Sequence, residues 1–374
     1  MSTVPLLTDP DELAELIGRL RSEPVVALDT EASGFHRYRE RLCLIQLSTR
    51  ERTFLVDPLA INDLAPLGKA LADPAVEWVI HDADYDLRML KKLGNFRAVN
   101  VFDTFVAAEL LNEPELGLAA NLKKHFGVQL NKKFQKADWS IRPLPADMLA
   151  YAAMDTAHLI QLRDILREQL IKRGRWAWAQ EEFQFLVNIP FEAQDDPGPG
   201  FLRIKGARAL KPKQLAVLRE LHAWREARSA QLDRAPFMVL GNDVMIELSK
   251  QPPADMQELA HRKGVGTSTL QRYGTAIMQA IDRGVGLPKE QWPRLERPKR
   301  WDRDDDYELR YERLRGVRER LMKEHDLQPG VLCANQLLSD IARVRPKDLG
   351  ELAGINGMRR WQVETFGAGL LAAL

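Results

Sequence analysis

The sequence predicts a mixed α/β domain followed by two all-helical domains. Over about the first 170 residues, short apolar runs alternate with amphipathic helical patterns. A segment rich in proline, glycine and acidic residues at 190–200 interrupts this alternation, and the helical sequence beyond it repeats at an offset of 93 residues. A chain of 374 residues also exceeds the size of one ordinary core. We therefore expect domains over residues 1–195, 207–284 and 304–374.

In the first domain, five apolar runs predict strands at Val25–Asp29, Leu42–Leu47, Thr53–Val56, Val76–Ile80 and Val101–Phe102. Only the polar stretch 48–52 separates the second run from the third, which favours a hairpin and a mixed rather than fully parallel sheet. Helical patterns lie at 61–72, 85–93, 104–111, 118–126 and 145–172.

The helical region contains two copies of one small module. Residues that shape a backbone recur in register, for example Pro236 with Pro329 and Gly264 with Gly357. A match of this kind without gaps indicates a tandem of separate modules rather than a solenoid. Trp224 and Trp361 are expected to anchor the module cores.

The composition argues against a membrane or exported protein. Hydrophobic residues make up 45% of the chain and charged residues 29%, and no apolar run is long enough to cross a bilayer. The first 21 residues lack the basic start and apolar middle of a secretory signal. Cys43 and Cys333 lie too far apart to indicate a disulfide framework or zinc site. We expect a cytoplasmic protein.

The small net charge of +1 conceals two halves of opposite sign. Residues 1–200 hold 23 Lys and Arg against 30 Asp and Glu, whereas residues 201–374 hold 31 against 23. The basic half could bind a polyanion such as nucleic acid. Helix faces that carry charge only for solvation remain the alternative.

Acidic residues follow two of the predicted strands. Asp29 and Glu31 end the first strand, and the two-residue period sends both side chains to one face. After the fourth strand, three aspartates precede or enter a helix, and Asp82 or Asp84 could serve as its N-cap. We choose Asp86 as the functional acid because leucines at 87 and 90 can pack it inward.

A third acidic motif, Tyr151-x-x-x-Asp155, lies inside a predicted helix. The four-residue spacing stacks the phenol and the carboxylate on one face. The helix otherwise buries apolar side chains, so an acid near that face needs a partner. A divalent metal ion is the partner that best fits a set of carboxylates.

Such a set suits phosphodiester hydrolysis. Two divalent ions about 3.5–4 Å apart neutralise charge on the phosphoryl oxygens and activate a water. Mg²⁺ and Mn²⁺ prefer oxygen ligands, so carboxylates are expected and histidine or cysteine is not. No phosphate-binding glycine loop follows a predicted strand, which disfavours a kinase or nucleotide-binding protein.

The ordered motifs Asp29-x-Glu31, Asp86 and Tyr151-x-x-x-Asp155 resemble those of the DEDD exonucleases with a tyrosine in the third motif, which have a ribonuclease H-like fold. The tandem modules resemble HRDC domains. One departure is Met148, where related sequences often carry glutamine. Further matching stretches are Leu44-Ile45-Gln46-Leu47, Asp103-Thr104, Asp138-Trp139 and Arg142-Pro143-Leu144.

The resemblance implies a metal-dependent 3′→5′ exoribonuclease that releases 5′-mononucleotides and trims tRNA precursors and other stable RNA, with no obligate protein partner. It implies that Asp29, Glu31 and Asp155 hold one metal ion, with Asp29 bridging to a second near Asp86. Tyr151 would hold the attacking water, and His81 is assigned no chemistry. Expected RNA contacts are Phe35, His36, Arg37 and Arg39 near the first motif and Lys205, Arg208, Lys211 and Lys213 at the first module.

Three alternatives stay open. The loop at 35–39 could be a solvated loop anchored by Phe35 instead of an RNA contact. A DNA-directed exonuclease of the same superfamily would share every metal ligand, since nothing in the sequence recognises a 2′-hydroxyl directly. The third is a non-enzymatic RNA-binding scaffold on a degenerate nuclease fold, which the intact acidic set disfavours.

Overall fold

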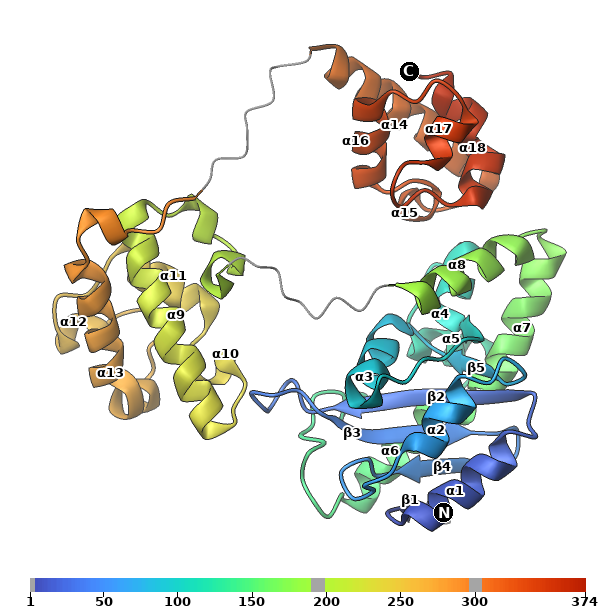
Figure 1. The fold of residues 1–374 in the computed structure, drawn as a ribbon, viewed down its shortest axis with the longest axis horizontal. Coiled ribbons are helices and arrows are strands. Elements are labelled where there is room, and N and C mark those ends of the chain that lie inside the picture. Colours follow the sequence, from blue (N-terminus) through green and yellow to red (C-terminus); the bar gives the residue numbers. More distant parts are fainter. Residues whose placement is uncertain (1–3, 190–198, 296–304) are drawn as a thin grey trace. The chain divides into compact units, whose positions relative to one another are not determined.

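The computed structural model describes residues 4–189, 199–295 and 305–374 (Figure 1). The described residues form two compact units. Of these residues, the first unit contains 4–31, 42–189 and 305–374, and the second contains 32–41 and 199–295. The first unit thus combines the α/β domain with the second helical module, and the second contains the first helical module. Residues 190–198 of the predicted proline- and glycine-rich segment lie outside the described residues, as do residues 296–304 between the two helical modules.

A six-stranded mixed sheet forms the α/β domain, in the order β1-β4-β3-β2-β5-β6. Strand β3 pairs antiparallel with β4, as the short connection predicts, whereas β2 pairs parallel with β5. The fold class is confirmed, and the first strand was not predicted. The strands are β1 (Leu6–Leu7), β2 (Val25–Ala32), β3 (Leu42–Ser48), β4 (Thr53–Val56), β5 (Glu77–Ile80) and β6 (Val101–Asp103).

Helices lie on both faces of this sheet (Figure 1). Helix α6 packs on β3 and β4, whereas α7 contacts β5 and α8 contacts β6. Burial on both faces explains why β2 begins with the continuous apolar run 25–28. The helices are α1 (Pro10–Leu20), α2 (Ala65–Leu71), α3 (Asp84–Gly94), α4 (Thr104–Leu110), α5 (Leu118–Phe126), α6 (Ala146–Ala157), α7 (Leu159–Lys172) and α8 (Trp176–Asn188).

Three helical features differ from the sequence predictions. The single helix expected over 145–172 is two helices, because the backbone leaves helical geometry at His158 (φ −115°, ψ 0°). Helix α1 was not predicted, although Asp9 caps it and Pro10 occupies its first position. Helix α8 was also not predicted.

The two helical modules share an internal architecture. In the first, the Arg225 guanidinium donates to the Leu240 carbonyl and to Asn242 Oδ1; in the second, Arg318 donates to the Cys333 carbonyl and to Asn335 Oδ1. The first contains α9 (Pro212–Leu232), α10 (Pro236–Val239), α11 (Asn242–Lys250), α12 (Met256–Ala260) and α13 (Thr267–Gly286). The second contains α14 (Asp305–His325), α15 (Pro329–Leu332), α16 (Asn335–Val344), α17 (Leu349–Ala353) and α18 (Arg360–Leu371).

Within the first unit, the second module packs against α8. The indole rings of Trp178 and Trp361 stack with centroids 4.5 Å apart. Trp361 Nε1 donates to Glu182 Oε1 at 2.7 Å, and the Glu181 carboxylate accepts from the backbone N–H groups that begin α18. Trp361 is 3% exposed, as expected of a core anchor. Among the described helices, none has the length and apolar character to span a membrane.

Candidate active site

Three carboxylates from two elements meet at one edge of the sheet. Asp29 and Glu31 project from β2, and Asp155 projects from α6. Each offers an oxygen within 4.8 Å of those of the other two. The alternation along the strand therefore places both of its acids beside the acid of the third motif. We call Asp29, Glu31, Asp86 and Asp155 the carboxylate cage.

Asp86 reaches the cage from the first turn of α3. Its carboxylate is 5% exposed and accepts a hydrogen bond from the Thr30 hydroxyl at 2.5 Å. Asp84 instead pairs with Arg88 on the exposed side of the helix, and Asp82 adopts a left-handed backbone (φ 61°). The buried member of the three aspartates is thus the one chosen from the sequence.

The backbone that leads into α3 is held by Asp103 at the end of β6. Its carboxylate accepts from the N–H groups of Asp82 and Ala83 and from two N–H groups at the start of α4. Burial raises the pKa of Asp103 to about 6 despite these bonds. Asp103 therefore fixes the start of the helix that carries Asp86, a role that the sequence analysis did not recognise.

Tyr151 lies next to the cage on α6. Burial, followed by the charges of Asp155 and Glu31, raises the pKa of its hydroxyl, so the phenol stays protonated. The ring packs beside those of Phe134 and Trp139, with centroids 5.8 and 6.1 Å away. A protonated hydroxyl held in this way can donate a hydrogen bond to a group inside the cage.

The cage is an electrostatically unfavourable cluster of acids. Burial raises the pKa of Asp29 to about 7, and burial together with the charge of Asp29 raises that of Asp155 to about 8. Burial and the charges of the other three raise the pKa of Glu31 to about 10. Burial also raises the pKa of Asp86, with the charge of Asp29 adding to the effect. A bound cation would relieve this repulsion.

Polar side chains of strand β3 hold residues of the cage and of helix α6 in place. Gln46 Nε2, fully buried, donates to Asp29 Oδ2 at 3.3 Å. The hydroxyls of Ser48 and Thr156 share a hydrogen bond of 2.7 Å that fixes α6 on the strand. Met148, the departure noted above, is buried in the core under α6. In the sequence, Gln46 and Ser48 differ from their neighbours only in being polar residues within or at the end of an apolar run, which is a weak indication of this role.

His81 belongs to the structural part of the site. Burial lowers its pKa to about 4, so the imidazole is neutral. Its Nδ1 shares a hydrogen bond of 2.8 Å with the Thr104 hydroxyl. This hydrogen bond joins the residue that follows β5 to the first residue of α4.

The predicted RNA contacts belong to the second unit, whereas the cage residues belong to the first. The Phe35 ring packs on that of Phe237 with centroids 5.0 Å apart, and the His36 carbonyl accepts from the N–H of Ala235 at 3.1 Å. The loop that holds Phe35, His36, Arg37 and Arg39 therefore rests on the first helical module. Lys205, Arg208, Lys211 and Lys213 are exposed around the entrance to α9.

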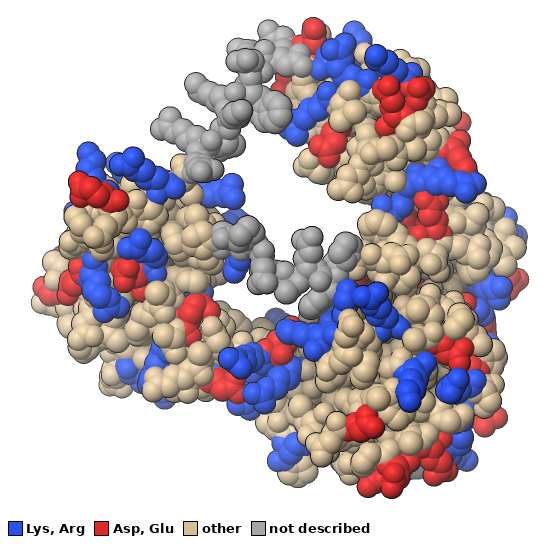
Figure 2. Space-filling view, in the orientation of Figure 1, with Lys and Arg blue, Asp and Glu red and all other residues tan. Residues whose placement is uncertain are grey.

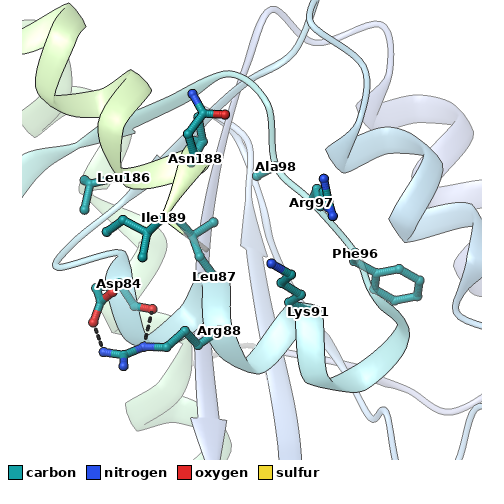
Figure 3. A pocket seen from close by; sticks show the side chains of 11 residues that line it. Asp84, Leu87, Arg88, Lys91, Phe96, Arg97, Ala98, Leu186, Asn188 and Ile189 are labelled. Carbon is teal, nitrogen blue, oxygen red and sulfur yellow. Dashed lines mark hydrogen bonds and ion pairs between the residues drawn. The ribbon is translucent and has the colours of Figure 1, made fainter. Parts of the chain in front are cut away.

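A basic recess of about 210 Å³ lies on the outer side of α3 (Figure 3). Arg88, Lys91 and Arg97 surround it, and Leu186 and Ile189 contribute apolar surface. Asp86 faces the opposite side of the helix, since it is buried against Thr30. The recess contains none of the predicted catalytic residues, so it is separate from the cage.

Comparison with known proteins agrees with this geometry. Residues 5–171 match the family model for a 3′-5′ exonuclease, and residues 214–281 and 308–374 each match the HRDC domain. The chain is 31% identical to ribonuclease D of Gluconacetobacter diazotrophicus, over 98% of this chain and 92% of that protein. It is also 31% identical to ribonuclease D of Granulibacter bethesdensis, over 98% and 91% of the two chains.

Solved structures show the same fold. The crystal structure of Escherichia coli RNase D has a TM-score of 0.71 and 23% identity, covering 99% of this chain and 98% of that chain. The catalytic core of RRP6 from Trypanosoma brucei has a TM-score of 0.64 and 28% identity over 76% of this chain and 81% of that chain. With its exonuclease domain, paired HRDC domains and full-length relatives, the chain belongs to the ribonuclease D family of 3′→5′ exoribonucleases.

Proposed function

We propose that the carboxylate cage is the catalytic centre, and that it hydrolyses RNA from the 3′ end with two divalent ions, Mg²⁺ or Mn²⁺. The observation that carries the proposal is the meeting of Asp29, Glu31 and Asp155 within 4.8 Å, with Asp86 buried beside them. No Lys or Arg forms an ion pair with these three among the described residues, so a cation is the partner that fits.

The donor set matches hard divalent ions. All four candidate ligands offer carboxylate oxygen, which Mg²⁺ and Mn²⁺ prefer. Asp29, Glu31 and Asp155 would hold one ion, with Asp29 shared toward a second at Asp86. When bound, such ions neutralise charge on the phosphoryl oxygens and lower the pKa of a water.

The chain's own groups supply orientation. The protonated Tyr151 hydroxyl can donate to the attacking water or to the scissile phosphate. Gln46 holds the Asp29 carboxylate in place, and Thr30 does the same for Asp86. These supporting bonds limit the motion of the ligands and so favour a fixed arrangement at the reacting phosphate.

For the substrates, we propose 3′ extensions of tRNA precursors and other stable RNAs. The support is the family membership together with the basic second half of the chain, which suits RNA. Cys43 and Cys333 are both buried and free, which is consistent with a reducing compartment such as the cytoplasm.

The direct test is a nuclease assay on a single-stranded RNA labelled at its 5′ end. With Mn²⁺ or Mg²⁺, the wild-type chain should produce a ladder that shortens from the 3′ end and releases 5′-mononucleotides, and EDTA should stop the reaction. Asp155→Asn should lower the rate by roughly a thousandfold or more, because the amide cannot replace the charge of a metal ligand.

Two controls give this assay its meaning. The Asp155→Asn chain should bind the same RNA about as tightly as the wild type, since binding does not depend on one cage ligand. If the Asp155→Asn variant cleaves RNA at the wild-type rate, the site assignment is wrong. Equal rates on matched DNA would contradict the assignment of RNA as the preferred substrate.

A further inference from the structure

The first helical module has a recess whose lining residues are not repeated in the second module. The recess has a volume of about 330 Å³ and lies along the seam between α9 and α13. The residues on α9 recur every three or four positions and therefore form one stripe of the helix. The seven lining residues are Trp224, Ala227, Arg228, Gln231, Arg272, Tyr273 and Ala276.

Aromatic and cationic groups are combined in this recess. Trp224 packs against the module core, as expected, but its ring stays partly exposed, and it meets the Tyr273 ring edge to face with centroids 5.9 Å apart. The Arg228 guanidinium lies 5.8 Å from the centre of the Tyr273 ring and donates to Gln231 Oε1. Arg272 is exposed at the rim. No Asp or Glu is among the described residues that line it.

The second module provides an internal comparison. The 93-residue offset places Val317 at the position of Trp224, Leu321 at that of Arg228 and Thr365 at that of Arg272. Leu321 is buried, and a Cβ atom at Gly369 of α18 would lie 3.6–3.7 Å from the side chains of Leu321 and Val317. Aliphatic side chains therefore replace Trp224 and Arg228 in the equivalent seam, where the one arginine is the exposed Arg320 at the position of Ala227.

The first module is also the more positively charged of the two. Residues 207–284 hold 12 Lys and Arg against 8 Asp and Glu, whereas residues 304–374 hold 11 against 12. Figure 2 shows charged side chains of both signs spread over the visible face of the first module, so charge alone does not define a site there. The combination of aromatic and cationic side chains in the recess distinguishes this part of the first module from the rest of its visible face.

We propose that this recess binds single-stranded RNA, with a base stacked against Trp224 and the flanking phosphates paired with Arg228 and Arg272. Aromatic rings next to cationic side chains are the usual means of holding single strands without reading their sequence. The inference rests on the exoribonuclease activity of the family and extends it by giving the two modules different roles. It does not depend on the carboxylate cage.

The test is equilibrium binding of a fluorescein-labelled oligoadenylate to the full chain, measured by anisotropy at several salt concentrations. EDTA is present to prevent hydrolysis, so the result does not depend on whether the cage is catalytic. Trp224→Val, which introduces the residue of the second module, should weaken binding roughly tenfold and leave the salt dependence unchanged. Arg272→Ala should weaken binding and lower the slope of log K against log salt by about 0.7.

Lys250→Ala is the matched control, because it removes one exposed positive charge from α11 of the same module outside the recess. It should leave both affinity and slope close to those of the wild type. Thermal unfolding shows whether Trp224→Val still folds. Arg272 is exposed, so we expect Arg272→Ala to fold like the wild type. If both recess variants bind as tightly as Lys250→Ala, the proposal is overturned.

Discussion

Burial dominates the chemistry of each cage residue. Asp29, Asp155 and Glu31 have pKa values raised to about 7, 8 and 10, and desolvation is the largest cause in every case. In the unfolded chain, carboxyl groups ionise at about 3.9–4.3. The folded chain without metal therefore retains protons that the unfolded chain has already lost.

This difference predicts that the cage destabilises the metal-free fold as the pH rises. Because the folded state binds more protons between about pH 4 and 10, the free energy of unfolding falls over that range, and the contribution present at low pH is lost. Asp155→Asn removes one of these groups. In EDTA at pH 8 it should be more stable than the wild type by about 2 kcal/mol, and the difference should vanish near pH 4.

Denaturant unfolding of both proteins at pH 4, 6 and 8 measures this effect, with Mn²⁺ added in a parallel series. Manganese should stabilise the wild type at pH 8 much more than the variant, since the variant lacks one ligand. A wild-type chain that gains stability relative to Asp155→Asn as the pH rises in EDTA would contradict the electrostatic account.

For single residues, the sequence predicts the direction of a side chain where the period of a strand or helix determines it. The strand period gave the common face of Asp29 and Glu31, and the helical period gave that of Tyr151 and Asp155. The supporting contact from Gln46 could not be predicted in this way, because it depends on which strand lies next to β2. Nor did local sequence show that Phe35 would pack on the first helical module.

Helix α6 is the element on which the site depends most, and the segment before it is fastened to the sheet. The Arg142 guanidinium donates to both carboxylate oxygens of Asp57, at 2.6 and 2.7 Å. It also donates to the carbonyl groups of Cys43 and Trp139. One side chain thus joins the entry of α6 to strand β3 and to the residue that follows β4.

Arg142→Lys should weaken this junction, because an ammonium group cannot make the paired contact with a carboxylate. Asp57 is 2% exposed, so it would remain buried with fewer partners. We expect a loss of about 2 kcal/mol in unfolding free energy and a lower kcat, with α6 less firmly placed. Denaturant unfolding and the nuclease assay measure the two effects; unchanged values in both would argue against this role.

The elements most easily predicted were those with a uniform local pattern. The strand at 53–56 and the helix at 118–126 have the bounds expected from sequence. The break at His158 was missed because neither proline nor glycine marks it. Strand β1 has only two residues, and its pairing with β4 is a long-range contact that no local pattern reveals.

In the molecule as a whole, the second helical module shares a hydrophobic cluster with α7 and α8 of the exonuclease domain. Glu182 is central to the polar part of this contact, since it accepts from Trp361 Nε1 and pairs with Arg359 at 3.0 Å. Both side chains of that ion pair are less than one fifth exposed. Contacts of this kind join segments far apart in the chain, so the sequence could predict the module but not its attachment.

Glu182→Ala should therefore loosen the second module. The change leaves the Trp361 indole N–H without its acceptor and removes the carboxylate partner of Arg359, whose guanidinium keeps its bond to the Gly357 carbonyl, at a cost of about 2–3 kcal/mol. Glu364→Ala is the matched control, because its pair with Arg360 is largely exposed to solvent and so contributes little to stability. Limited proteolysis should release a fragment near residues 305–374 faster in Glu182→Ala alone; equal rates in both variants would contradict the contact's importance.

The most direct measurement is a crystal structure of the chain soaked with Mn²⁺ and a nucleoside 5′-monophosphate. Anomalous scattering should place two manganese ions among Asp29, Glu31, Asp86 and Asp155, with the phosphate beside them and near the Tyr151 hydroxyl. Manganese bound elsewhere, with the four carboxylates making no contact to metal or phosphate, would contradict the assignment of the cage as the catalytic centre.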